Sequence, residues 1–150
     1  MRTGLVSLIG LLSVLALAAQ EGAVKTPLKR YEVVVDLNSY PQTTPKEMLG
    51  SVVSAVAARH IDYVLAQLAE PAWVDRRVKE TGGGFAGLVE ESTARLVGDA
   101  VTVKRFKKLL ADGEWKIEQS TASVRLKDDT ENFVFFRKVG ERWYLENRKK

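Results

Sequence analysis

The sequence predicts an α+β domain, because its middle has the apolar spacing of helices and its last third has the alternation of strands. Apolar residues recur every three or four positions in several runs between residues 44 and 112. Beyond Trp115 the period changes to two, and short polar turns separate the apolar runs. Helices followed by a strand meander are typical of the α+β class. We therefore expect one domain over residues 44–150, with helices packed on about four antiparallel strands.

A long helix near residues 45–58 begins this domain. Thr44 and Glu47 have the spacing of a capping box, and Pro45 suits the first helical position. A broad stripe without charge follows at helical spacing, so we expect the helix to lie deep in the core: Met48, Leu49, Val52, Val53 and Val56. A second, shorter helix ends before Pro71 and presents an apolar face formed by Ile61, Val64, Leu65 and Leu68.

A helical insert near residues 71–112 comes next and is broken into three short helices. The triplet at residues 82–84 (GGG) separates the first from the second, because glycine costs about 1 kcal/mol in a helix interior. The triplet lacks the Lys-Ser/Thr pair and the preceding strand of a phosphate-binding loop, so we interpret it as a flexible joint. The acidic residues Asp75, Glu90 and Glu91 are interpreted as solvated faces of the insert.

Four strands are expected between residues 115 and 146, joined by turns at 119–120, 127–129 and 139–141. Residues 133–136 (FVFF) are apolar on both faces, as in a covered central strand. The other strands alternate, so one face of the sheet should be buried. This alternation predicts that the carboxylates face outward at Glu118, Glu131 and Glu146.

The first 19 residues have the pattern of a secretory signal peptide. Arg2 is the only charged residue before Glu21, and the run between them is apolar. Small residues predict a cleavage region at Ala18, Ala19 and Gln20. The alternative is an uncleaved membrane anchor, but a span needs roughly 20 apolar residues and this run is shorter.

We therefore expect a secreted protein, exported to the periplasm or outside the cell and carrying no stable membrane anchor after cleavage. Residues 20–43 follow the signal peptide as a linker, with an extended segment at residues 31–37.

Composition excludes several classes of site. The chain contains no cysteine, which excludes disulfides, thiolate metal sites and cysteine nucleophiles. Its 23 basic and 19 acidic side chains give a net charge of +4. These charges are well mixed along the sequence, unlike the concentrated basic face of a nucleic-acid-binding protein, so nucleic acid is not an expected partner.

Three stretches together resemble the nuclear transport factor 2-like superfamily, which has the cystatin-like cone fold. They are residues 44–68 (TPKEMLGSVVSAVAARHIDYVLAQL), 121–127 (TASVRLK) and 133–147 (FVFFRKVGERWYLEN). The resemblance implies curved strands that wrap around the long helix. The helical insert departs from the family pattern, since many relatives have early strands there. The superfamily includes isomerases, dehydratases, cyclases and scaffold modules, so the fold does not decide the function.

His60 is the single histidine of the sequence, which excludes a multi-histidine metal site. His60 and Asp62 are the weak candidates for a catalytic acid–base pair of the kind found in some members of the superfamily. Residues two apart on a helix do not face each other, so we favour a surface or capping role for His60. The sequence indicates no cofactor and no metal.

A basic patch is the remaining candidate, formed by Lys104, Arg105, Lys107 and Lys108. It would bind an anionic surface, although such charge runs usually form the solvated side of an amphipathic helix.

The favoured hypothesis is an exported, non-enzymatic binding or scaffold domain that holds a small apolar ligand or a protein partner. The alternative is a cofactor-free enzyme of the isomerase, cyclase or dehydratase type, with His60 or an acid inside the cone. An ionisable side chain pointing into an open cavity would favour the enzyme.

Overall fold

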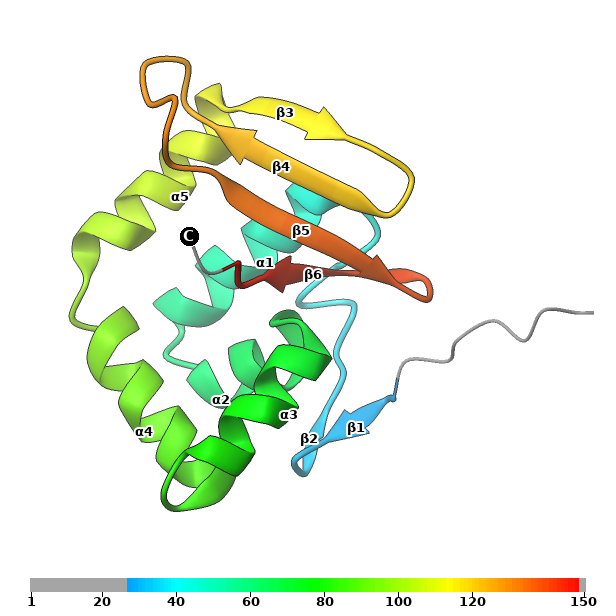
Figure 1. Cartoon of the computed structure of the whole chain (residues 1–150), viewed down its shortest axis with the longest axis vertical. Helices are drawn as coiled ribbons and strands as arrows, with labels where there is room; N and C mark the ends of the chain where they lie inside the picture. Colours follow the sequence, from blue (N-terminus) through cyan, green and yellow to red (C-terminus); the bar gives the residue numbers. More distant parts are fainter. Residues whose placement is uncertain (1–26, 149–150) are drawn as a thin grey trace, which may run out of the picture.

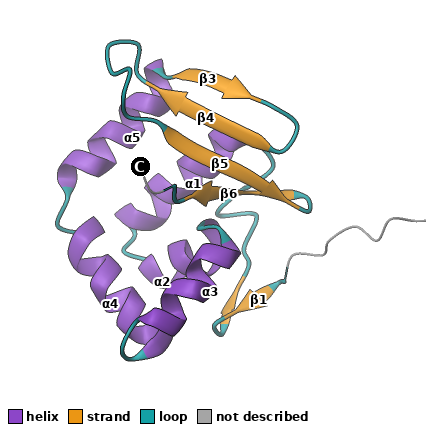
Figure 2. Cartoon of the chain, viewed as in Figure 1, coloured by secondary structure: helices purple, strands orange, loops and turns teal. Residues whose placement is uncertain are grey.

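The computed structural model describes residues 27–148, so the predicted signal peptide and its cleavage region lie outside the described residues. The fold is α+β: in this part of the chain a two-stranded antiparallel sheet comes first, five α-helices follow, and a four-stranded antiparallel sheet ends it (Figures 1 and 2). The elements in chain order are β1 (Lys29–Arg30), β2 (Val33–Val34), α1 (Pro45–Ala57), α2 (Ile61–Tyr63), the π-helical turn η1 (Val64–Leu68), α3 (Pro71–Glu80), α4 (Gly84–Leu96), α5 (Ala100–Asp112), β3 (Glu114–Ile117), β4 (Thr121–Arg125), β5 (Val134–Val139) and β6 (Arg142–Glu146).

The predicted capping box starts α1. The Thr44 hydroxyl accepts from the Glu47 N–H, and the Glu47 carboxylate accepts from the Thr44 N–H. The helix ends with Arg59 in the left-handed region at φ 61°. There the N–H of His60 donates to the Ala55 carbonyl and the N–H of Arg59 donates to that of Val56, which is a Schellman motif. This cap turns the chain from α1 into α2.

The predicted second helix is present, but its last turn is π-helical rather than α-helical. The apolar face predicted from Ile61 to Leu68 is therefore only part of the buried surface, because all five residues of η1 are buried. Gln67 is among them and donates from its amide to the carbonyl oxygen of Val33 at 2.8 Å. The wider turn thus buries a polar side chain that joins the N-terminal segment to the core.

The helical insert contains α3, α4 and α5, and the break between α3 and α4 lies at the glycine triplet that the sequence indicates. Gly83 and Gly84 take positive φ values of 86° and 62°, a conformation that side chains with a Cβ rarely adopt. They form the turn from α3 to α4. Asp99 caps α5 by accepting from the N–H groups of Val101 and Thr102.

The four-stranded sheet is a meander in the order β3-β4-β5-β6, as predicted. One face of this sheet packs on α1 and α5, and its core includes Val124, Phe136 and Leu109, which are fully buried. Trp115 on β3 stacks on Phe136 of β5, with ring centroids 5.5 Å apart. Met48 of α1 completes this packed face, so side chains fill the space between the sheet and the helices.

The free edge of β6 is closed by two other segments. The N–H of Trp143 donates to the carbonyl oxygen of Gln42, and the N–H of Glu70 donates to that of Leu145. The side-chain amide of Gln42 donates to the carbonyl oxygens of Trp143 and Gln67. This closure explains why β6 is buried on both faces although it ends the sheet.

The extended segment predicted at residues 31–37 contains a hairpin turn. Tyr31 and Glu32 have positive φ values of 49° and 65° and connect β1 to β2. Two contacts compensate for this uncommon conformation. Tyr31 stacks on Phe85 with ring centroids 4.2 Å apart, and its hydroxyl donates to Asp75, which also pairs with Arg30. Contacts between segments this far apart produce no local periodicity, so the sequence pattern does not predict this turn.

We expect Gly87→Ala to destabilise the protein by about 1–3 kcal/mol. A Cβ at Gly87 would lie 2.2 Å from the carbonyl oxygen of Gly82, so the turn between α3 and α4 would have to move. Urea unfolding followed by circular dichroism measures this loss.

Gly50→Ala is the matched control, because a Cβ at this position in α1 meets nothing within 4 Å. The added helix propensity should stabilise the protein by about 0.5–1 kcal/mol. Equal effects of the two substitutions would contradict the steric argument.

Candidate binding cleft

A cleft with a volume of about 630 Å³ opens between the helical insert and the end of the sheet. Its helical side comes from η1, α3 and α4, and its sheet side comes from the start of β5 and the end of β6. Figure 1 shows β5 and β6 above α3 and α4, with the end of the described chain beside this region. Sites for small molecules span roughly 300–1,000 Å³, so the cleft has the size of a ligand site.

The lining of the cleft is mainly apolar. Val64, Leu65 and Leu88 are buried and form its inner part, whereas Phe133 is exposed at 41% of its surface. An open apolar surface of this kind favours a ligand with an apolar body, because contact removes that surface from water. The apolar lining residues are Val64, Leu65, Ala69, Trp73, Leu88, Leu96, Phe133, Val134, Phe135 and Leu145.

Two ion-pair networks, each of alternating arginine and glutamate side chains, border this lining. The first, which we call the helix network, runs Arg95–Glu91–Arg77–Glu80 on α3 and α4. The closest N–O distances are 2.8 Å from Arg95 to Glu91, 3.2 Å from Arg77 to Glu91 and 3.3 Å from Arg77 to Glu80. The first three residues of this network line the cleft.

The second, which we call the sheet network, runs Arg148–Glu146–Arg137–Glu70. Arg148 and Arg137 approach the Glu146 carboxylate at 2.9 Å and 2.7 Å, and Arg137 lies 3.6 Å from Glu70. The guanidinium of Arg148 also lies over the ring of Phe135, 4.3 Å from its centroid. Arg148 and Glu146 line the cleft.

The predicted outward orientation of Glu146 is correct, because it lies on the face of the sheet opposite to Phe136. The expected exposure of its side chain is wrong. Glu118 and Glu131 are exposed as expected, whereas the side chain of Glu146 retains only 6% of its surface. Burial raises the pKa of the Glu146 carboxyl, but hydrogen bonds from Arg148 and Arg137 outweigh burial and hold the pKa below its ordinary value. Glu146 is therefore an ionised partner of two arginines at neutral pH.

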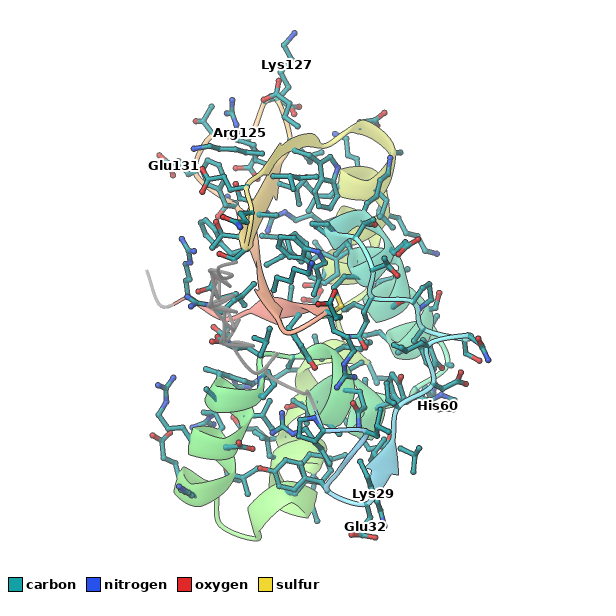
Figure 3. The ribbon with its side chains drawn as sticks, turned by 90° about the vertical axis from the view of Figure 1, so that its right-hand side faces the viewer. Lys29, Glu32, His60, Arg125, Lys127 and Glu131 are labelled. Atoms are coloured by element: carbon teal, nitrogen blue, oxygen red, sulfur yellow. The ribbon has the colours of Figure 1, made fainter. Side chains whose placement is uncertain are left out.

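His60 and Asp62 are not brought together as a catalytic pair. His60 follows the Schellman motif on the surface, and its Nδ1 is hydrogen-bonded to the hydroxyl of Tyr40 at 2.8 Å. Asp62 is exposed on α2, and neither residue lines the cleft. Figure 3 shows His60 and the cleft residue Glu131 at opposite edges of the molecule.

The four cations of the predicted basic patch divide between two sides of α5. Lys104 and Lys107 line a second cavity of about 380 Å³ together with Arg59. Arg105 instead donates to the carbonyl oxygen of Asn132 at 2.7 Å and pairs with Asp129, so it holds the loop between β4 and β5. Lys108 is exposed and lines neither of these cavities.

Within residues 27–148, no three histidine, aspartate or glutamate side chains are grouped as metal ligands would be. No helix in this same range combines the length and the hydrophobicity needed to cross a membrane. No protein-family model matches the chain, and neither a characterised protein nor a solved structure is detectably similar to it.

The sequence pattern does not predict the cleft. Glu91 is not simply part of a solvated face, because it joins two arginines from two helices. The spacing of Glu91 and Arg95 is one signal that was available, because residues four apart on a helix pair readily. The contact of Glu91 with Arg77 depends on how α3 packs against α4, and no local pattern encodes it.

We expect Glu146→Gln to destabilise the protein by about 2 kcal/mol at neutral pH, because Arg137 and Arg148 lose their shared charge partner. The folded-state pKa of Glu146 is lowered, so its contribution is present above the pKa of the unfolded chain. That contribution is lost as the pH falls through the lower, folded-state pKa.

Chemical unfolding of wild type and variant from neutral to acidic pH should therefore show converging stabilities. Glu90→Gln, at an exposed position of α4, is the control and should leave stability nearly unchanged. A Glu146→Gln effect that persists undiminished at low pH would contradict the ion-pair explanation.

Proposed function

We propose that this protein is an exported, non-enzymatic binding domain whose ligand site is the cleft between α3, α4 and the end of the sheet. The supporting observation is an open, mainly apolar cleft of about 630 Å³. We further propose, from the sequence resemblance alone, that the domain belongs to the nuclear transport factor 2-like superfamily. The ligand enters beside the sheet, because side chains of α1 and α5 fill the face that the cone would enclose.

The electrostatics of the cleft favour binding over acid–base catalysis. A general acid or base needs a pKa near the working pH, usually through burial without a charge partner. Glu146 is buried but held ionised by two arginines, and Glu91 is likewise paired with two arginines. These carboxylates therefore serve as charge partners that orient arginine side chains.

The alternative function, a cofactor-free isomerase, cyclase or dehydratase, has one supporting observation. Glu131 is an exposed carboxylate on the lining of the cleft, in hydrogen-bond reach of solvent. Its carboxylate is exposed and is not enclosed in an apolar pocket of the kind that a catalytic carboxyl occupies in such enzymes. Binding therefore remains the function that we propose.

We expect Ser92→Trp to abolish binding in the cleft. Ser92 lies on α4 and lines the cleft, so an indole there occupies the space of the ligand without removing a core side chain. The probe is neutral N-phenylnaphthylamine, whose fluorescence increases in an apolar site. Wild-type protein should enhance its fluorescence in a saturable way, and the variant should lower the affinity at least about tenfold.

Ala94→Trp is the matched control, because it adds the same side chain at an exposed position of α4 outside the cleft. Its probe affinity should equal that of wild type. No saturable enhancement with the wild-type protein, or equal losses in both variants, would overturn the assignment of the cleft as the ligand site.

A further inference from the structure

We infer that the ligand of the cleft is an anionic amphiphile, with its apolar chain on the lining and its acidic head between Arg95 and Arg148. This inference rests on the proposed function and adds the chemical class of the ligand. The inference starts from the shared order of the two networks, since each runs arginine, glutamate, arginine, glutamate. Each network ends at the cleft in an arginine that forms an ion pair with a single carboxylate of the described chain, Arg95 with Glu91 and Arg148 with Glu146.

The inner arginines are held more firmly than the outer ones. Arg77 contacts both Glu91 and Glu80, and Arg137 contacts both Glu146 and Glu70. Arg95 is bound to Glu91 alone among the ion pairs of the described chain, and its side chain is 76% exposed. An exposed ion pair of this kind contributes little to stability, so Arg95 can turn to a ligand at low cost.

Arg148 can also turn from its carboxylate partner to a ligand, because its side chain is 44% exposed. If Arg148 moves to an acidic head, Glu146 remains paired with Arg137 at 2.7 Å, so no buried carboxylate is left without a cation. The stacking of Arg148 on Phe135 places its charge beside an apolar ring of the lining. Head and chain sites are therefore contiguous.

Charge complementarity selects an anion over a cation. Glu91 and Glu146 each face two guanidinium groups, so a cationic head approaching either carboxylate meets two like charges. An acidic head meets the outer arginines first, and guanidinium groups bind carboxylates in a planar, two-pronged geometry. Glu131 is the one lining carboxylate outside both networks, and it is exposed to solvent.

The experiment compares three amphiphiles with the same chain and different heads: dodecanoate, dodecanol and dodecyltrimethylammonium, each below its micelle concentration. Full-chain protein is titrated by displacement of N-phenylnaphthylamine. We expect dodecanoate to bind at least about tenfold more tightly than dodecanol, and the cation to bind most weakly. Added salt should weaken the binding of dodecanoate and leave that of dodecanol unchanged.

The variant Arg95→Gln/Arg148→Gln should bring the affinity for dodecanoate down to that for dodecanol. Arg76→Gln/Lys79→Gln, at two exposed positions of α3 outside the cleft, removes the same number of positive charges and should keep the wild-type preference. If the double variant does not fold, the salt dependence of the wild-type protein tests the same point.

Equal binding of dodecanoate and dodecanol would overturn the acidic head while leaving the proposed function intact. A preference for dodecyltrimethylammonium would overturn it as well. Failure of all three amphiphiles and of the neutral probe to bind would instead overturn the proposed function itself, so the two failures are distinguishable.

Discussion

The hydrogen bonds of Gln42 are the interaction on which the rest of the structure depends. Gln42 is 1% exposed, and its side-chain amide nitrogen donates to the main-chain carbonyl oxygens of Gln67 and Trp143. Its main-chain carbonyl oxygen accepts from the N–H of Trp143. One residue thereby joins the segment before α1, the π-helical turn and the last strand. These contacts are buried, where hydrogen bonds without water competition are strongest and missing partners are costly.

The closure of β6 by Gln42 and Glu70 also determines which part of the sheet lines the cleft. It covers the edge of the sheet beside η1 and leaves the start of β5 and the end of β6 facing α4. The helices of the insert complete the other side. A sheet with an open edge strand would expose unpaired backbone N–H and C=O groups at that edge. In this sheet the edge is covered, and the cleft is lined by apolar side chains and bordered by paired charges.

Local patterns explain why the secondary structure could be predicted from the sequence. The capping box at Thr44, the glycine turn before α4 and the alternation of β4 each act over a few neighbouring residues, and the structure confirms all three. The turn at Tyr31 was not predicted, because its stability comes from Phe85 and Asp75, far along the chain.

The same distinction applies to the candidate site. Sequence reasoning selected His60 for its chemistry and the lysines near residue 104 for their density, and these residues lie apart from the cleft. The charges that border the cleft come from α3, α4, β5, β6 and the residues beside them, and they meet only in the folded structure. Their order can be recognised only when α3, α4 and the sheet are in place, since each carboxylate takes its arginines from different parts of the chain.

The hydrogen bond from Arg142 to Pro27 has a consequence for folding kinetics. It joins positions 115 residues apart, and the contacts of Gln42 with Trp143 span 101. The first described segment therefore gains part of its contacts only when the last strand is in place. Contacts between residues this far apart in the sequence slow folding, because a long stretch of chain must be ordered before they form.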